Sequence, residues 1–288
     1  MKPLIVIVGE TASGKSALAL EVAKRFNGEI IGADSWTVYC EFDVGTAKPS
    51  AEELQAIPHH LYDIVNASDG FNAALFKKLA NEAIIEIQSR GKLPILTGGT
   101  GLYIDSIIFD FEFLPLGTDM ERIRRNAMTI GDLLAEAKAR AVNLDHIDIR
   151  NKRRIIRALE TNGQLPRSSE LRKNTVVIGI QTERDQLRHR VTNRVDKMIE
   201  LGLEKEVSEL AKKYDWDVEP MKGIGYREWH DYFLDTQTLE QTRERIISST
   251  MKLAKRQRTW FKRNNSIHWV TNIDETVDII TTILNKSE

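Results

Sequence analysis

The sequence predicts an α/β fold in which helices flank a parallel sheet that starts at a phosphate-binding loop (P-loop). First, Gly9–Ser16 reads Gly-Glu-Thr-Ala-Ser-Gly-Lys-Ser and fits the pattern G-x-x-x-x-G-K-[ST] at every fixed position. Second, the first half of the chain alternates short apolar runs with helical spacing, which indicates right-handed βαβ units. Third, the second half reads as mostly charged helix, so we expect a helical elaboration beside the sheet.

The flanks of the P-loop fit its function. Leu4–Val8 is a β-branched apolar run, typical of a buried parallel strand. Gly9 and Gly14 permit backbone conformations that a side chain would block, Lys15 adds a positive charge, and Ser16 can ligate Mg²⁺. This context favours a phosphate or diphosphate site over a chance match, without identifying the molecule. On the helix that follows, the spacing predicts buried positions at Ala17, Leu18, Leu20, Val22 and Ala23.

The remaining elements follow from periodicity and from turn residues. Gly91 is expected to end one helix, Gly131 to break another, and Asn162-Gly163 to end a third. The further predicted strands are 29–34, 61–65, 94–97, 175–180 and 267–270. The predicted helical stretches are 71–90, 119–140, 149–161, 183–213 and 239–263.

Three segments should meet at one edge of the sheet. Gly9–Ser16, Asp34-Ser35 and Gly98–Gly101 all follow predicted strands, and ligands of parallel sheets bind at the carboxyl ends. Asp34 could hold Mg²⁺ through water or act as a general base; the alternative is an Asx-turn or helix cap. The glycines of Gly98–Gly101 could let the backbone approach a ligand, to which Thr100 would offer a hydroxyl, or they form a plain strand-to-helix turn.

Composition limits the classes that remain. The 288 residues are 41% hydrophobic and 29% charged, enough for one large domain with an elaboration or for two small ones. The net charge of −1 gives no general affinity for nucleic acid, so any such partner needs a local patch. Cys40 is the only cysteine, which excludes an internal disulfide and favours a cytoplasmic setting. The N-terminal apolar run is too short for a signal peptide, and we expect no membrane partner.

Two basic clusters could meet an RNA backbone. Arg153, Arg154 and Arg157 lie on adjoining parts of one helix face, although a solvated face explains them equally simply. Trp260 and Phe261 lie within the denser cluster, and basic residues with aromatics suit RNA; an amphipathic helix that covers the core is the alternative. That cluster consists of Lys252, Lys255, Arg256, Arg258, Lys262 and Arg263. The adjacent His59-His60 shows no metal-ligand spacing and is read as structural or as part of a polar cleft.

Several short motifs accompany the P-loop in a fixed order over nearly the whole chain. They are Asp34-Ser35 with Val38-Tyr39, Gly45–Pro49, His59–Leu61 with Asp63-Ile64, Gly98–Tyr103, Arg154–Glu160, Gly223–Glu228, and Lys255–Gln257 with Thr259–Phe261. With these motifs the chain resembles the bacterial tRNA dimethylallyltransferase family, the IPP transferases. A generic P-loop protein has no need of Gly-Thr-Ala-Lys-Pro or Lys-Arg-Gln-x-Thr-Trp-Phe, so the resemblance is specific.

The resemblance implies a reaction and its partners. In that family the P-loop holds dimethylallyl diphosphate, and the dimethylallyl group moves to the exocyclic amine (N6) of the adenine 3′-adjacent to the anticodon, which is flipped out of its stack. It implies Mg²⁺ on Ser16, a tRNA anticodon stem-loop as partner, and a monomer. The implied catalytic residues are Asp34, Thr100 and Lys15. The implied diphosphate-binding residues are Gly9, Thr11, Ala12, Ser13, Gly14, Lys15, Ser16 and Arg227. The implied tRNA-binding residues are Asp34, Ser35, Trp36, Thr37, Thr100, Arg122, Arg153, Arg154, Ile155, Ile156, Arg157, Lys255 and Arg256.

Two features depart from the family pattern. Thr37 stands where the family has a glutamine that reads the target adenine, so base discrimination could be weaker or lie elsewhere. The stretch between Leu114 and Arg153 is shorter than usual, and Arg150-Asn151 replaces the customary Asn-Asp. We therefore expect a catalytic core in 1–114, a short helical insertion in 115–150, and the rest of the core with the tRNA-binding helices in 151–288.

Three other functions remain open from the sequence. A small-molecule kinase would use the same P-loop with ATP, but it leaves Gly98–Tyr103 and the C-terminal basic helix unexplained. An adenylate isopentenyltransferase would modify a free nucleotide, which needs no long basic surface. An RNA-binding P-loop protein that has lost its chemistry is compatible with Thr37, but Lys15, Ser16 and Asp34 all remain.

Overall fold

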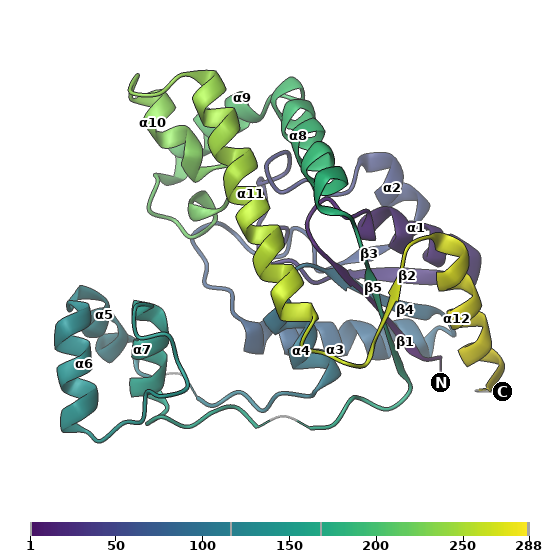
Figure 1. The fold of residues 1–288 in the computed structure, drawn as a ribbon, viewed down its shortest axis with the longest axis horizontal. Helices are drawn as coiled ribbons and strands as arrows, with labels where there is room; N and C mark the ends of the chain where they lie inside the picture. Colours follow the sequence, from purple (N-terminus) through teal and green to yellow (C-terminus); the bar gives the residue numbers. More distant parts are fainter. Residues whose placement is uncertain (1, 116, 168, 287–288) are drawn as a thin grey trace. The chain divides into compact units, whose positions relative to one another are not determined.

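The computed structural model describes residues 2–115, 117–167 and 169–286, and the chain divides into two compact units (Figure 1). The first unit combines Met1–Ile108 with Leu171–Glu288, and the second is Phe109–Glu170. The second unit is therefore an insertion between two halves of the first. It begins earlier and ends later than the insertion expected at 115–150.

The first unit is built on a parallel sheet in the order β3-β2-β4-β1-β5-β6, which confirms the predicted fold class. The predicted strand at 61–65 is wrong. Leu61 and Asp63 adopt left-handed φ values of 65° and 52°, so the chain turns there, and the edge strand is His59-His60. The strands are β1 Leu4–Gly9, β2 Gly28–Gly32, β3 His59–His60, β4 Leu93–Gly98, β5 Thr175–Ile180 and β6 Ile267–Val270.

Helices cover both faces of this sheet. Ile5 and Ile7 of β1 point to the face that is covered by α1 (Lys15–Phe26) and α12 (Ile273–Lys286). Helices α3 (Ala73–Ser89) and α4 (Gly101–Ile108) pack on the sheet and on each other. The buried residues of α1 are Leu18, Ala19, Val22 and Ala23. One of its predicted positions is therefore wrong, because Ala17 is exposed, whereas Leu20 is half-buried and packs against this core.

A helical layer follows β5 and forms a second apolar cluster in the same unit (Figure 1). The predicted stretch 183–213 is two helices, because Gly202 turns the chain at φ 93°. The capping box of Thr238 and Gln241 starts the longest of the helices, α11. The elements are α8 Arg184–Glu200, α9 Leu203–Tyr214, η1 Pro220–Lys222, η2 Arg227–Trp229, α10 His230–Phe233 and α11 Leu239–Phe261. Helix α2, Ala51–Ala56, lies earlier in the chain and was not predicted, nor was α12.

The described residues of the second unit form three helices with their own apolar core. They are α5 Asp119–Ala127, α6 Ile130–Ala139 and α7 Lys152–Glu160. The break between α5 and α6 is set by Thr129, whose side chain accepts the Asp132 N–H in a capping box, and not by Gly131. Asn151 caps α7, so this helix starts three residues later than predicted.

No helix in the described part of the chain combines the length and the apolar character needed to cross a bilayer.

Close packing of the backbone at the end of β4 requires a glycine at position 98. A Cβ atom there would overlap the backbone carbonyl of Ala33 at the end of β2, which cannot move without disrupting the sheet. We expect Gly98→Ala to lower the free energy of unfolding by about 2–3 kcal/mol, as overpacking of a core does. Urea unfolding monitored by circular dichroism measures this. Gly70→Ala is the matched control because nothing lies within 4 Å of its added methyl group. Equal stabilities of the two variants would contradict this packing.

Candidate active site

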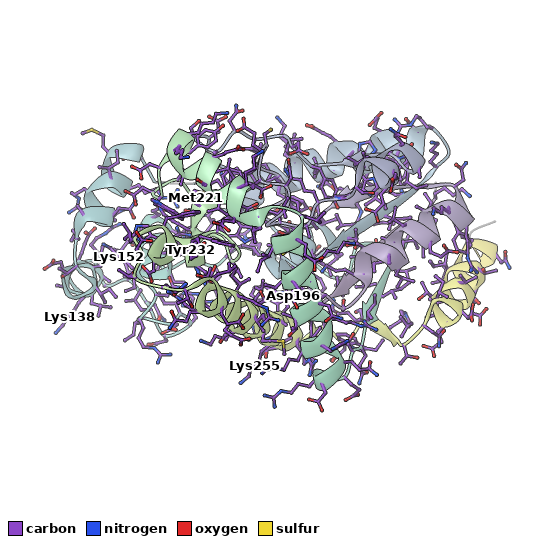
Figure 2. The ribbon with its side chains drawn as sticks, turned by 90° about the horizontal axis from the view of Figure 1, so that it is seen from above. Lys138, Lys152, Asp196, Met221, Tyr232 and Lys255 are labelled. Atoms are coloured by element: carbon purple, nitrogen blue, oxygen red, sulfur yellow. The ribbon has the colours of Figure 1, made fainter. Side chains whose placement is uncertain are left out.

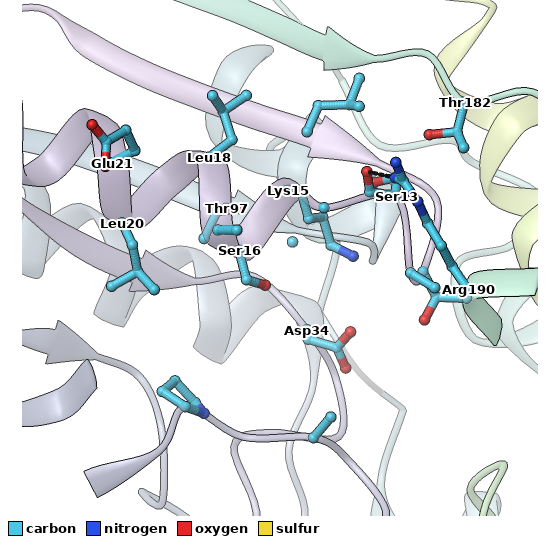
Figure 3. A pocket seen from close by; sticks show the side chains of 18 of the residues that line it. Ser13, Lys15, Ser16, Leu18, Leu20, Glu21, Asp34, Thr97, Thr182 and Arg190 are labelled. Atoms are coloured by element: carbon cyan, nitrogen blue, oxygen red, sulfur yellow. Dashed lines mark hydrogen bonds between the residues drawn. The ribbon is translucent and has the colours of Figure 1, made fainter. Parts of the chain in front are cut away.

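The carboxyl ends of the strands open into a cavity of about 1010 Å³. The P-loop, Asp34 and Gly98 all line it, so the predicted convergence of these three segments is confirmed (Figure 3). Gly14 precedes α1 with φ 100° and provides no side-chain cap. The first N–H groups of α1 are therefore open to an anion in the cavity.

Lys15 lies at the centre of this cavity (Figure 3). Its Nζ donates to the carbonyl oxygen of Glu10 at 3.3 Å. Burial lowers the pKa of Lys15 to about 8; Asp34 and Glu10 oppose this shift, whereas Arg194 adds to it. An anion bound at the P-loop would favour the charged form and raise this pKa again.

Two arginines of α8 also reach the P-loop, and the sequence reasoning missed them. Arg190 Nη1 donates to the Ser13 carbonyl oxygen at 2.9 Å (Figure 3). Arg194 donates to Thr11 Oγ1 at 3.3 Å and to the Thr46 carbonyl oxygen at 3.4 Å. Burial lowers the pKa of Arg194. Their spacing of one helical turn, on a helix that starts just after β5, was the available signal.

Arg227, in contrast, is not among the described residues that line this cavity. Its side chain is 52% exposed and pairs with Glu228 at 3.0 Å. Arg190 and Arg194, in contrast to Arg227, donate hydrogen bonds to the P-loop.

The segment from Asp34 to Thr37 is fixed by backbone hydrogen bonds. Asp34 Oδ1 accepts the Trp36 N–H at 3.0 Å, so the residue forms the Asx-turn and also faces the cavity. Thr100 Oγ1 accepts the Ser35 N–H at 3.0 Å, and the Thr100 N–H donates to the Ala33 carbonyl at 3.2 Å. Thr100 therefore holds the strand end that carries Asp34.

Thr37 lies on the cavity wall and is 7% exposed. Its hydroxyl has no hydrogen-bond partner among the described residues. A buried hydroxyl without a partner carries a free-energy penalty that a polar ligand would remove. Thr37 can therefore contribute one hydrogen bond to a substrate, where a glutamine would contribute more.

Side chains of helix α11 contact the P-loop and the segment that follows β4. Gln257 is buried; its Oε1 accepts the Thr11 N–H at 2.8 Å, and its Nε2 donates to the Gly99 carbonyl at 3.0 Å. Arg258 forms an ion pair with Glu10 through both carboxylate oxygens. Helix α11 is thus bonded to the backbone of the phosphate site.

The glycines after β4 make room for this helix and not for a ligand, which corrects the expectation from the sequence. A Cβ atom at Gly99 would overlap Gln257, and one at Gly101 would overlap the Trp260 ring. Trp260 Nε1 donates to Asp105 at 2.8 Å, and Phe261 is buried. The aromatics of the Lys-Arg-Gln-x-Thr-Trp-Phe motif therefore pack against the core, with Phe261 buried and Trp260 half-buried.

The exposed side of α11 keeps a basic surface. Lys255 lies on this outer side (Figure 2), and the neighbouring basic side chains follow it at helical spacing. Arg258 is only half-buried, but its charge is already paired with Glu10. The exposed basic residues are Lys252, Lys255, Arg256, Lys262 and Arg263.

The second unit uses several of the predicted tRNA-binding residues for its own structure. Ile155 and Ile156 are buried in its core, so their side chains cannot reach a tRNA. Arg157 donates to the Leu114 carbonyl at 2.6 Å, and Arg122 pairs with Glu160 at 3.5 Å. Arg153 and Arg154 are exposed on α7.

Ser16 is the residue that could hold a metal. Its side chain borders the cavity on the side of Asp34 (Figure 3). Among the described residues there is no group of three or more His, Cys, Asp or Glu side chains suited to a metal ion. Mg²⁺ that accompanies a diphosphate needs only one or two protein oxygens, so Ser16 with Asp34 nearby fits it.

A family model described as IPP transferase matches residues 37–264. The chain belongs to the IPP transferase family. A tRNA dimethylallyltransferase of Pediococcus pentosaceus is 42% identical over 284 residues, which cover 93% of this chain and 91% of that protein. One of Acetivibrio thermocellus is 40% identical over 292 residues, with 96% and 93% covered.

Solved structures agree with this family assignment. The tRNA isopentenylpyrophosphate transferase of Bacillus halodurans is 36% identical with a TM-score of 0.76, and 99% of this chain and 97% of that chain are covered. That of Staphylococcus epidermidis is 34% identical with a TM-score of 0.75, and both chains are covered completely. The chain is therefore a transferase, and the family predicted from its motifs is confirmed.

The pKa of Lys15 predicts a proton linkage. Near pH 8.5 much of Lys15 is neutral in the free protein, because its pKa is about 8. A bound diphosphate favours the ammonium, so binding of dimethylallyl diphosphate should take up about three-quarters of a proton at this pH and should weaken as the pH rises further. Calorimetry in buffers of different ionisation enthalpy counts these protons.

Lys15→Arg is the control for this linkage. The guanidinium stays charged at this pH, so the variant should bind with the proton uptake abolished. A wild-type protein that takes up no protons would contradict this linkage, because Lys15 would then already be charged without ligand.

Proposed function

We propose that this chain transfers a dimethylallyl group from dimethylallyl diphosphate to N6 of the adenine 3′-adjacent to the anticodon of tRNA. The observation that carries the proposal is the convergence of Lys15, Arg190 and Arg194 on the P-loop, with Asp34 on the same cavity. Its family supports the substrates, because relatives of similar length are tRNA dimethylallyltransferases.

The P-loop is suited to binding the diphosphate as a leaving group. When the C–O bond to the allyl carbon breaks, both bonding electrons go to the diphosphate oxygen. Lys15 and the open N–H groups of α1 would stabilise this charge, because they are already oriented by the fold. Arg194 connects the P-loop to Thr46 by hydrogen bonds and would add a further positive charge beside the diphosphate. Mg²⁺ held at Ser16 would neutralise part of the same charge.

Asp34 is suited to accepting the proton of the nucleophile. The N6 amine forms the new bond to the allyl carbon and must lose a proton, since a neutral substituted adenine is the product. Asp34 faces the cavity with one carboxylate oxygen fixed by the Trp36 N–H. An oriented carboxylate near the amine would take this proton as a general base. Thr100 would act through Ser35 by positioning this segment.

An apolar wall lies beside Asp34. A smaller cavity of about 70 Å³ is bordered by Asp34 and Arg194 and by apolar side chains of α8 and α11, among them Val191 and Ile246. Such a wall would keep water from the allyl group while positive charge develops on it.

The tRNA would meet exposed basic side chains in both units. Lys255 and Arg256 of α11 and Arg153 and Arg154 of α7 are the candidates for its phosphates. Trp36 and Thr37 are the candidates for the flipped adenine. We take Phe109–Glu170 as the helical elaboration for tRNA, and we expect a monomer that acts in the cytoplasm.

Mass spectrometry of tRNA nucleosides tests this function. After incubation with dimethylallyl diphosphate and Mg²⁺, adenosine next to the anticodon should gain one dimethylallyl group. ATP in place of the allyl donor should give no product, and free AMP should not serve as acceptor. Transfer to AMP alone would point to an adenylate isopentenyltransferase, and ATP-dependent phosphorylation would point to a kinase.

Asp34→Asn tests the role of the carboxylate within this reaction. The amide keeps the size of the side chain but cannot accept the proton, so single-turnover transfer should slow by about 10²- to 10⁴-fold while both substrates still bind. Rescue of the rate by excess Mg²⁺ would show instead that Asp34 positions the metal. Unchanged transfer would remove Asp34 from the chemistry.

A further inference from the structure

The loop from Asp43 to Pro49 borders the same cavity as the P-loop. Thr46, Ala47, Lys48 and Pro49 all line the cavity. Arg194 donates to Thr11 Oγ1 in the P-loop and to the Thr46 carbonyl in this loop, so one side chain connects the two. The place of the loop therefore helps to set where Arg194 stands at the diphosphate site.

This loop is held from outside the cavity by the carboxylate of Glu206 on α9. The carboxylate accepts three successive backbone N–H groups: from Val44 at 2.8 Å, from Gly45 at 3.1 Å and from Asp43 at 3.3 Å. Hydrogen bonds to a charged acceptor are stronger than neutral ones, so this set fixes the first turn of the loop. Glu206 is not among the described residues that line the cavity.

Tyr226 completes the arrangement as a fourth donor to the same carboxylate. Its hydroxyl donates to Glu206 Oε1 at 2.7 Å, and the residue is fully buried. Burial, and then the charge of Glu206, raise the pKa of Tyr226 far above its usual range, so the hydroxyl keeps its proton. The Glu206 carboxylate thus accepts hydrogen bonds from three backbone N–H groups and from the Tyr226 hydroxyl.

Close packing of the backbone leaves the loop little freedom to shift. A Cβ atom at Gly45 would overlap the Tyr226 ring. Gly225 has φ 96°, and a Cβ there would lie 3.2 Å from the Gly45 carbonyl oxygen. The motifs Gly45–Pro49 and Gly223–Glu228, which a P-loop alone does not explain, therefore meet at Glu206.

The other end of the loop is fixed by Lys48. Its Nζ donates to the Tyr39 carbonyl at 2.7 Å and to Asp43 at 2.7 Å, and it also pairs with Asp63. The charge of Lys48 is therefore used inside the loop, although the residue lines the cavity. Glu206 is the corresponding anchor for the first half.

We propose that Glu206 is a positioning residue for the reaction, which acts by fixing the Asp43–Pro49 loop and, through Thr46, the place of Arg194 at the diphosphate. The inference rests on the proposed function, because it assumes that the anion bound beside this loop is the diphosphate of dimethylallyl diphosphate. Glu206 forms its hydrogen bonds with the loop and with Tyr226, and none of these bonds involves Lys15 or Asp34. Binding of the allyl diphosphate should therefore depend on Glu206 more than the chemical step does.

Glu206→Gln tests this role with little change in shape. The amide keeps one acceptor oxygen but turns an NH₂ group toward backbone donors, so the loop should loosen. We expect the KM for dimethylallyl diphosphate to rise about tenfold, because hydrogen bonds to a charged acceptor are lost. The kcat should change less than about threefold. Hydrogen exchange should quicken at the amides of 43–45 and not across the sheet.

Glu209→Gln is the matched control. Glu209 lies one turn further along α9, is exposed, and pairs among the described residues with Lys205 at 3.9 Å. It should leave both kinetic constants and the exchange of 43–45 unchanged. An unchanged KM for Glu206→Gln would overturn the inference, as would an equal fall in kcat and in kcat/KM.

Tyr226→Phe provides a second variant in case Glu206→Gln does not fold. It removes the hydroxyl donor but keeps the ring that packs on Gly45, and we expect the KM to rise about threefold. A KM equal to that of the wild-type protein would overturn the inference on its own. A wild-type protein that transfers no dimethylallyl group would contradict the proposed reaction and not the role of Glu206. In that case, calorimetry of dimethylallyl diphosphate binding to the wild-type protein and to Glu206→Gln still tests the role of Glu206.

Discussion

The buried amide of Gln257 is the contact on which the site depends most. It accepts from the P-loop at Thr11 and donates to the Gly99 carbonyl after β4, so it joins two neighbouring strand ends from a helix that starts 18 residues earlier at Leu239. A backbone N–H or carbonyl left without a partner in such a buried place is costly. This requirement explains why position 99 has no Cβ, since any side chain would displace the amide.

The electrostatics of the cavity follow from that geometry. A loop held in this form brings Lys15, Arg190 and Arg194 together, and burial disfavours the charged forms of Lys15 and Arg194. Asp34 offsets only part of this positive charge, and a diphosphate has the charge that the cavity lacks. The same loss of solvation that destabilises the empty set of cations strengthens their attraction for the leaving group.

The sequence predicted those parts of the site whose position is determined by neighbouring residues in the chain. The P-loop spacing and a strand end at Asp34 are local patterns, and the rule for parallel sheets was enough to bring them together. Arg190 and Arg194 were missed because their direction depends on how α8 packs, which no spacing on one helix determines. Ile155 and Ile156 show the reverse error, since a motif implied tRNA contacts where the helix needed core residues. The glycines at 99 and 101 were expected to admit a ligand or to form a plain turn, whereas the group that approaches them is α11.

The central claim is that α11 completes the diphosphate site, and the affinity for dimethylallyl diphosphate in Gln257→Leu tests it most directly. Leucine keeps the approximate volume but pairs neither Thr11 nor Gly99. Calorimetry with Mg²⁺ should show binding weakened about tenfold or more in a folded protein, since both backbone partners are left unsatisfied. Thr259→Ala, an exposed change on the same helix, should bind like the wild-type protein. Wild-type affinity in Gln257→Leu would contradict the account.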